Sequence, residues 1–311
     1  MNLSLDYDSP ASLRHFLDER GFGMQKKFGQ NFLVNRNARE RLVDALGAGP
    51  DDEVWEIGPG LGAMTVPLLS RGCRVSVFEI DRGFSAVLRE MFSEEPRFSI
   101  VEGDVLKTWP REAQRNNPPA FFFGNLPYNI AATLIASFIE SGCFFRKAVV
   151  TVQKEVADRM VAKPGSKDYS SFSVLCSSAY SVKPLMTLKP HSFYPAPNVD
   201  SAAVVMDRRP FDGEHGKCTP DGSLDVPPLL RLLVRALFSS RRKTVRNNLD
   251  AFLRSGKTGY PIPPEQCQNI VTRSLEKSGI DPLARAETLS LDDFSRLTNA
   301  LFFLSGEKES A

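Results

Sequence analysis

Short apolar runs alternate with amphipathic segments along the first two thirds of the chain. Apolar runs flanked by glycine, proline and polar residues predict buried strands at 53–57, 74–79, 98–102, 120–124 and 147–153. Apolar residues spaced three or four positions apart predict helices at 11–21, 36–46, 64–69, 83–92 and 130–141. Strands that alternate with helices are typical of an α/β domain, with helices on both faces of a mostly parallel sheet.

The pattern changes after Pro190. A further strand is expected at 201–207, where it would close the sheet, and the stretch 208–228, rich in proline, glycine and charge, is interpreted as a linker or surface excursion. From Leu229 onward the spacing of apolar residues is helical, with helices expected at 229–237, 242–254, 264–278 and 291–304. The sequence therefore predicts a smaller, all-helical C-terminal domain.

Composition limits the class of protein. A chain of 311 residues with 42% hydrophobic content can bury a sizeable core, and its net charge of +2 indicates no particular partner. The 5 cysteines form no CxxC pair and no metal-ligand spacing, which favours reduced thiols in a cytoplasmic protein without a metal site. No run approaches the roughly 18 apolar residues of a membrane span, so we expect a soluble protein.

Ligand-type groups follow three successive predicted strands. The segment Glu56–Gly62, with sequence EIGPGLG, joins the end of the first strand to a glycine turn, Glu79 ends the second strand, and Asp104 follows the third. The carboxyl ends of parallel strands meet at one sheet edge, where glycines admit a ligand to the backbone and a carboxylate can accept ribose hydroxyls. Taken singly, each feature could be an ordinary loop or a capping acid. Together they favour a nucleoside cofactor, and the lack of an extended phosphate cradle favours S-adenosylmethionine over NAD.

The fourth predicted strand ends in GNLPYNI, so Asn125 to Tyr128 should face the same cleft. An adenine amine is a poor nucleophile because its lone pair is delocalised into the ring. Acceptors on its hydrogens, the Asn125 side-chain carbonyl and the Leu126 backbone carbonyl, would direct that lone pair at a methyl donor. Tyr128 offers a face for stacking a flipped base, and Pro127 stiffens the turn. A proline turn with a core tyrosine is the structural alternative.

The motifs GQNFL, EIGPGLGAMT, FEIDR, EGDVL, GNLPYNI and FYPAPNVDSAAV occur in this order. The ordered set resembles the ribosomal RNA adenine N(6)-dimethyltransferase family in its bacterial small-subunit (16S) branch, whereas NLPY alone is shared with many amino-methyltransferases. The resemblance implies a Rossmann-like class I methyltransferase domain at 1–207 that uses S-adenosylmethionine, with N-terminal helices and a lid at 1–47. A linker at 208–228 and a helical RNA- or ribosome-binding domain at 229–311 complete the expected organisation.

The resemblance also implies roles for individual residues. Asn31 and Leu33 contact S-adenosylmethionine from the lid, and Gly58 lies under its methionine moiety. Glu79 binds the ribose, Asp104 the adenine, and Asn125 both the donor pocket and the target amine. Phe193 closes on the target base opposite Tyr128, although its spacing also fits a core phenylalanine before a proline-rich turn. The expected catalytic residues are Asn125, Leu126, Pro127, Tyr128 and Phe193.

Basic residues gather at the start of a predicted helix, at Arg241, Arg242, Lys243 and Arg246. Such a cluster suits phosphate contacts that position RNA without determining its sequence, although a solvated helix face is the simpler interpretation. Lys26 and Lys27 are candidates for a second basic edge. The segment FSSRRKTVRNNL resembles the family's signature at the start of its helical domain.

The function implied by the resemblance is dimethylation of two adjacent adenosines in the 3′-terminal hairpin loop of 16S rRNA. The expected partner is 16S rRNA in an immature small ribosomal subunit, with no membrane partner and with the protein a monomer. Two alternatives stay open on sequence grounds. One is a large-subunit rRNA methylase that confers antibiotic resistance, and the other is a non-catalytic RNA-binding assembly factor.

Overall fold

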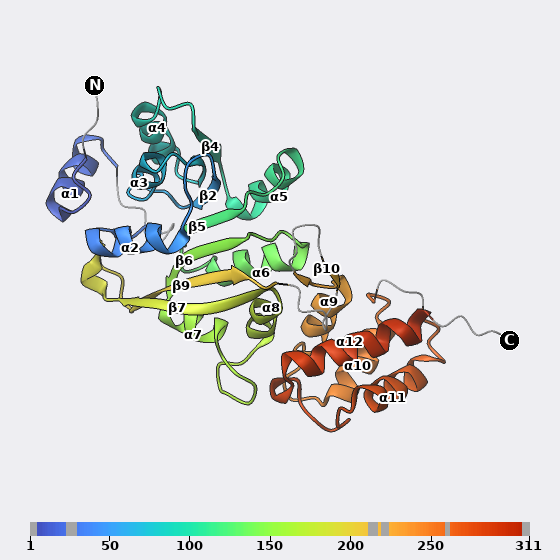
Figure 1. The fold of residues 1–311 in the computed structure, drawn as a ribbon. Coiled ribbons are helices and arrows are strands. Elements are labelled where there is room, and N and C mark those ends of the chain that lie inside the picture. Colours follow the sequence, from blue (N-terminus) through green and yellow to red (C-terminus); the bar gives the residue numbers. More distant parts are fainter. Residues whose placement is uncertain (1–4, 23–29, 211–216, 219–223, 259–261, 307–311) are drawn as a thin grey trace. The chain divides into compact units, whose positions relative to one another are not determined.

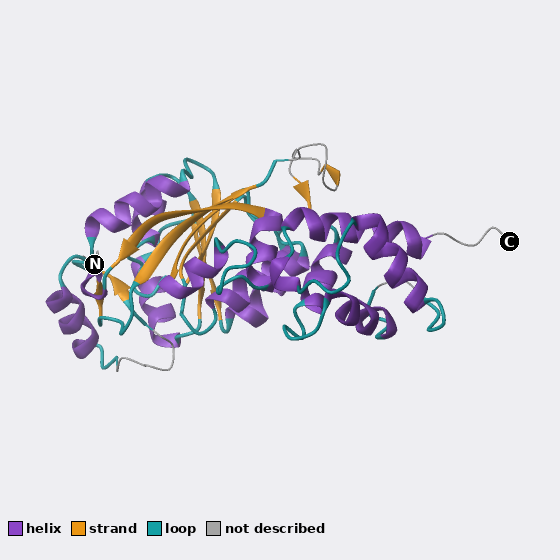
Figure 2. Ribbon diagram, turned by 90° about the horizontal axis from the view of Figure 1, so that it is seen from below, coloured by secondary structure: helices purple, strands orange, loops and turns teal. Residues whose placement is uncertain are grey.

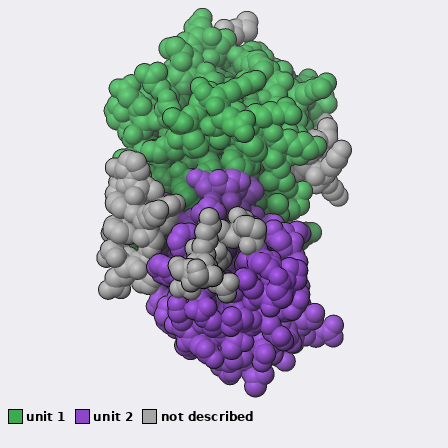
Figure 3. Space-filling view, turned by 90° about the vertical axis from the view of Figure 1, so that its right-hand side faces the viewer, with its two compact units in different colours: residues 1–135, 143–157, 182–207 green, residues 136–142, 158–181, 208–311 purple. Residues whose placement is uncertain are grey.

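The computed structural model describes residues 5–22, 30–210, 217–218, 224–258 and 262–306. The chain forms two compact units, coloured separately in Figure 3. Unit 1 comprises residues 1–135, 143–157 and 182–207, and unit 2 comprises residues 136–142, 158–181 and 208–311. Lys26 and Lys27 lie outside the described residues. The division into domains expected from the sequence stays a prediction.

Unit 1 is built on a seven-stranded sheet with the order β4-β3-β2-β5-β6-β9-β7 (Figure 1). The first five strands in this order pair in parallel, and β9 is antiparallel to β6. Their bounds are β2 Glu53–Ile57, β3 Arg74–Glu79, β4 Phe98–Glu102, β5 Phe121–Asn125, β6 Lys147–Gln153, β7 Tyr180–Leu188 and β9 Ser201–Arg208. The predicted α/β class with a mostly parallel sheet is confirmed.

The expectation that the strand at 201–207 closes the sheet is wrong. That strand, β9, lies between β6 and β7, and β7 forms the edge. The sequence of β7, YSVKPLMTL, gave no strand signal because its buried and exposed positions do not alternate and Pro184 interrupts it. A proline removes a backbone donor, so strands that contain one are typically found at sheet edges.

Helices flank the sheet (Figure 2). They are α1 Pro10–Glu19, α2 Arg36–Leu46, α3 Thr65–Ser70, α4 Arg82–Met91, α5 Val105–Arg115, α6 Ala131–Ser141 and α7 Lys154–Met160.

The packing of the central strand β5 explains why three phenylalanines are adjacent in its sequence. Phe121 and Phe123 pack in one core cluster, while Phe122 packs against Phe145, with ring centroids 5.1 Å apart. A parallel strand covered on both faces is apolar at every position.

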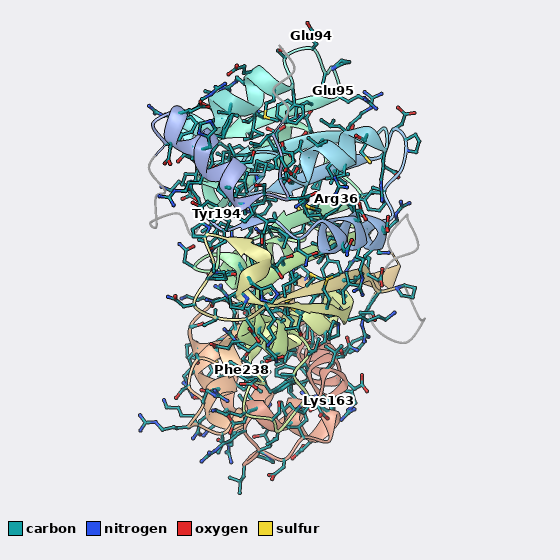
Figure 4. All side chains as sticks on the ribbon, turned by 90° about the vertical axis from the view of Figure 1, so that its left-hand side faces the viewer. Arg36, Glu94, Glu95, Lys163, Tyr194 and Phe238 are labelled. Carbon is teal, nitrogen blue, oxygen red and sulfur yellow. The ribbon has the colours of Figure 1, made fainter. Side chains whose placement is uncertain are left out.

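Unit 2 is mainly helical, as predicted from Leu229 onward. It contains α8 Ser171–Ala179, α9 Pro228–Leu237, α10 Val245–Arg254, α11 Cys267–Ser278 and α12 Leu291–Gly306, with a short pair of strands β10 Lys217–Cys218 and β11 Leu224–Asp225. Helix α8 was missed because it is buried almost all round, which removes the amphipathic signal. Phe238, labelled in Figure 4, stacks on Phe294 with centroids 6.1 Å apart.

Two further short strands matter for the site. Strand β1 (Phe32–Leu33) pairs antiparallel with β8 (Phe193–Tyr194), and Leu33 is opposite Phe193. This pairing joins the predicted lid, at residue 33, to the FYPAP segment, at residue 193. Among the described residues, no helix is long and apolar enough to cross a membrane.

Candidate active site

A pocket of about 300 Å³ lies at the carboxyl ends of β2, β3, β4 and β5, and residues 30–33 also line it. Most of the residues predicted for the site line this one pocket: Asn31, Leu33, Gly58, Glu79, Asp104, Asn125, Leu126, Pro127 and Tyr128. Sequence positions up to 97 residues apart, from 31 to 128, are thus brought together. Convergence of strand tips at a parallel sheet edge is the expected place for a ligand in an α/β fold.

The glycine turn allows two close approaches. Gly58 has φ +71°, and a Cβ there would lie 3.3 Å from the backbone oxygen of Asn125. Gly60 has φ +57°, and a Cβ there would lie 2.8 Å from Cε1 of Phe32. Both positions therefore require glycine, since a left-handed conformation strains other residues and neither neighbour leaves space. The first glycine admits the tip of β5, and the second admits the ring of the lid.

Glu79 is a buried carboxylate that faces the pocket, with only 6% of its surface exposed. Its Oε1 accepts a hydrogen bond from the backbone N–H of Asp81 at 2.8 Å. Burial raises the pKa of Glu79 to about 7, while backbone N–H donors lower it. A carboxylate held this way can accept hydrogen bonds from two neighbouring hydroxyl groups, such as those of a ribose.

Asp104 combines two roles that the sequence presented as alternatives. It is the N-cap of α5, where Oδ1 accepts from the backbone N–H of Leu106 at 3.1 Å, and it also lines the pocket. The cap fixes the carboxylate, while Oδ2 is 3.9 Å from Nζ of the exposed Lys107. The aspartate is therefore pre-oriented at the pocket wall.

The tip of β5 places an amide and a ring at the pocket. Asn125 donates from Nδ2 to the backbone oxygen of Asn31 at 2.8 Å, and within the described part of the chain no donor is paired with Oδ1. The hydroxyl of Tyr128 lies 2.6 Å from Oγ of Ser201, and burial raises the pKa of this tyrosine. The buried Leu126 is held by its N–H donating to the carbonyl of Thr151 at 3.0 Å.

Phe193 is not among the residues that line the pocket. It is 3% exposed and packs in the core cluster that contains Leu33. Its placement matches the alternative of a core phenylalanine before a proline-rich turn. The base-closing role implied by the resemblance stays a prediction.

Sequence reasoning assigned no role to Glu56, yet it lines the pocket and is 1% exposed. Its Oε2 accepts from the hydroxyl of Thr65 at 2.7 Å, and burial, with a smaller contribution from Glu79, raises its pKa to about 8. A charged residue inside the apolar strand VWEI was the available signal, because an acid at such a position is rarely buried without a function.

The basic cluster lies in unit 2, on the turn before α10 and on its first turn. The predicted helix start at 242 is wrong, because Thr244 is the N-cap and the helix begins at Val245. Arg242, Lys243 and Arg246 are exposed. Arg241 differs, because its Nη2 lies 3.0 Å from Oε2 of Glu287. Cations at a helix N-terminus oppose the helix dipole, so this arrangement favours an anionic partner over helix stability.

The pocket fits S-adenosylmethionine by its own chemistry. It offers a buried hydrogen-bond acceptor at Glu79, an acid fixed by its capping role at Asp104, and a left-handed glycine at Gly58, where a Cβ would press on the tip of β5. The described residues contain no cluster of histidine, cysteine and acids that could hold a metal ion. Within the described part of the chain, four cysteines are free, buried thiols: Cys73, Cys143, Cys176 and Cys267.

Comparison with known proteins decides between the classes that share this geometry. The family model described as "Ribosomal RNA adenine dimethylase" matches residues 21–300. The chain belongs to the ribosomal RNA adenine dimethylase family. It is thus an S-adenosylmethionine-dependent rRNA adenine methyltransferase, and the predicted class I methyltransferase fold with a helical C-terminal portion is confirmed.

Individual relatives support this family assignment. "Ribosomal RNA small subunit methyltransferase A" of Treponema denticola is 44% identical over 95% of this chain and 96% of its own length. A dimethyladenosine transferase from Plasmodium falciparum has a TM-score of 0.66 and 26% identity, over 85% of this chain and 94% of that one. The 23S rRNA methyltransferase ErmE, with a TM-score of 0.59 and 23% identity over 88% and 100% of the two chains, shares the fold.

Proposed function

We propose that this adenine dimethylase methylates the N6 amines of two adjacent adenosines in the 3′-terminal hairpin loop of 16S rRNA. Its substrate would be an immature small ribosomal subunit, and the protein would act as a cytoplasmic monomer in subunit biogenesis. The observation that carries the proposal is the position of Asn125 on the donor pocket, with Nδ2 already engaged by Asn31 and Oδ1 available. The relatives named as small-subunit methyltransferases support the choice of rRNA.

Asn125 and Leu126 would orient the amine. When bound, S-adenosylmethionine supplies an activated methyl group, so the protein's task is alignment of the acceptor nitrogen. Oδ1 of Asn125 and the backbone oxygen of Leu126 would accept the two amine hydrogens and favour a more tetrahedral nitrogen. Pro127 fixes the spacing of these acceptors, because its carbonyl accepts from the N–H groups of Ile130 and Ala131, both at 3.1 Å. The amine proton leaves to solvent after transfer.

Tyr128 would stack on the flipped base. Its hydroxyl is held 2.6 Å from the buried Ser201, which limits rotation of the ring and reduces the entropy lost on stacking. Phe193 would take the opposite face of the base. Because its ring now lies in the core beside Leu33, that role requires the ring to leave the cluster when RNA binds.

Arg242, Lys243 and Arg246 would contact RNA phosphates. All three are exposed, and the N–H groups at the start of α10 add to the attraction for an anion. Arg241 would contribute less, because Glu287 already neutralises it. The RNA would be positioned by its backbone and shape, and the target adenosines would be presented as unstacked bases.

Mass mapping of rRNA from a strain that lacks this chain tests the assignment. We expect the two adenosines of the small-subunit hairpin to be unmethylated in that strain and dimethylated after complementation. Intact dimethyladenosines in the deletion strain would refute the proposal. Loss of a large-subunit methylation would instead favour the activity named for ErmE, whose 23% identity shows shared fold alone.

The membership in the adenine dimethylase family does not support the alternative of a non-catalytic assembly factor. The pocket at the strand tips also argues against it, because a protein that only binds RNA has no need of a buried glutamate that faces such a pocket. Purified protein that bound immature subunits but transferred no labelled methyl group would establish that alternative.

A further inference from the structure

Gln30 lies on the pocket wall, where its side chain has one anchor among the described residues. Its Nε2 donates to Oδ2 of Asp81 at 3.2 Å, whereas its buried Oε1 has no hydrogen-bond partner among the described residues. The anchor is firm, because Oδ1 of Asp81 accepts from the backbone N–H groups of Gly83 at 2.8 Å and Phe84 at 3.2 Å. Asp81 also donates its own N–H to Glu79. Gln30 is therefore attached to the turn that holds the buried carboxylate.

The segment Gln30–Leu33 is fixed at its other end as well. The carbonyl of Leu33 accepts from Nη1 of Arg39 at 2.8 Å, and Arg39 is itself 8% exposed. Phe32, between the two anchors, packs on Phe84 with ring centroids 5.7 Å apart. The backbone at Asn31 is thus held between Asp81 and Arg39.

This backbone sets the orientation of Asn125. The carbonyl of Asn31 accepts from Nδ2 of Asn125 at 2.8 Å across 94 residues of sequence. A side-chain amide is planar, so a donor fixed on its nitrogen side also fixes the direction of Oδ1. An acceptor that must meet an amine within a few tenths of an ångström needs such support from neighbouring groups.

We propose that Gln30 is a positioning residue, which holds the segment Gln30–Leu33 on Asp81 so that the carbonyl of Asn31 orients the Asn125 amide. Gln30 touches Asp81, Asp81 caps α4 beside Glu79, and Asn31 follows Gln30 directly in the chain. The turn at Asp81, beside the buried Glu79, and the side-chain amide of Asn125 are thereby joined through one short segment. The consequence for methyl transfer rests on the proposed role of Asn125.

The direct test is nuclear magnetic resonance of the Asn125 side-chain amide in the free protein, assigned with Asn125→Asp. Gln30→Met removes the anchor at similar side-chain length, and Asn37→Ala removes an exposed amide on α2 as the matched control. We expect the water-exchange rate of the bonded Asn125 amide proton to rise about 3- to 10-fold in Gln30→Met and to stay unchanged in the control. An unchanged rate in Gln30→Met overturns the inference.

A double substitution that reverses the direction of the hydrogen bond between residues 30 and 81 controls for misfolding of the single variant. Gln30→Glu places two carboxylates together and should loosen the Asn125 amide, whereas Gln30→Glu with Asp81→Asn restores a donor–acceptor pair of opposite direction. Asparagine also serves as an N-cap, so α4 should be preserved. The double variant should recover the slow exchange, and failure to recover in a folded double variant contradicts the anchoring role.

Kinetics then separate positioning from donor binding. With saturating donor and RNA, Gln30→Met should lower kcat about 10-fold at unchanged KM for RNA, and the effect should vanish in an Asn125→Ala background. Calorimetry with S-adenosylhomocysteine should show less than a threefold change in Kd. Equal kcat losses with and without Asn125 would refute action through that amide. Absence of all methyl transfer by the unmodified protein would instead refute the proposed function and leave the resonance test standing.

Discussion

Donor binding should depend on the protonation of Glu79. The carboxyl is 6% exposed, and burial raises its pKa to about 7 in the free protein. The ionised form offers an acceptor oxygen to each ribose hydroxyl, whereas protonation converts one of these oxygens into a donor and weakens binding. The fraction of protein able to bind falls as pH drops through 7, so the apparent Kd rises about tenfold between pH 8 and pH 6.

Replacement by glutamine removes both the charge and the titration. Glu79→Gln keeps one acceptor oxygen but loses a charge-assisted hydrogen bond, which costs about 1.5–3 kcal/mol, or roughly 10- to 150-fold in Kd at pH 8. Its Kd should then be nearly the same at pH 6 and pH 8. Because glutamine is close to glutamate in size, the contact with the N–H of Asp81 can be kept.

Calorimetric titration with S-adenosylhomocysteine from pH 6 to pH 8 makes the measurement. Glu56→Gln is the matched control, because Glu56 is the other buried acid in the pocket and its pKa is raised to about 8. This control should retain the rise in Kd at pH 6. An equal pH response in Glu79→Gln and the unmodified protein would refute the assignment of the response to Glu79.

Three further perturbations test other parts of the structure. Gly60→Ala should weaken donor binding at least about threefold, because its Cβ would displace Phe32. Gly165→Ala is the control, because Gly165 also has a positive φ (+78°) but open space around it, so this variant should change only stability. Equal donor binding by the two variants would show that the ring is not displaced. Glu56→Gln should raise the free energy of unfolding, measured in urea titrations, by about 1–3 kcal/mol at pH 8 and by little at pH 5. A carboxyl whose pKa is raised in the folded state destabilises the folded protein as pH rises from the unfolded pKa near 4.5 toward the folded pKa of about 8. A stability difference that did not grow with pH would contradict the raised pKa. The double variant Arg242→Ala, Lys243→Ala should reduce the slope of log affinity for RNA against log salt concentration by about 1.4. Arg241→Ala should reduce it less, because Arg241 is paired with Glu287. Equal slopes for the double variant and the unmodified protein would show that Arg242 and Lys243 do not contact the RNA.

The sequence predicted many of the elements whose burial is visible in local patterns, although it missed the amphipathic helix α5. Phe121 to Phe123 are apolar in succession because both faces of β5 are covered, and that pattern identified a central strand. Helix α8 and strand β7 escaped because burial all round α8 and the proline-containing edge of the sheet leave no periodic signal. Periodicity reports a boundary between core and solvent, and these elements lack a regular one.

The site was more predictable than its connections. Glycines and acids at the ends of predicted strands are recognisable from local sequence alone, so Gly58, Glu79 and Asp104 could be assigned to the site before the fold was known. The bonds of Gln30 to Asp81 and of Asn125 to Asn31 could not, because they join segments whose approach depends on the whole fold. Phe193 shows the same limit, since its sequence context allowed both a core position and a base contact.

The proposed role of Asn125 is to orient a target amine beside the methyl donor. Labelled methyl transfer to immature small subunits from a strain lacking the activity measures this role, with the unmodified protein compared with Asn125→Ala. We expect the unmodified protein to place label on the two adjacent hairpin adenosines, whereas Asn125→Ala should transfer at least about 100-fold less at saturating RNA and bind RNA with unchanged affinity. Transfer by Asn125→Ala at the rate of the unmodified protein would contradict it.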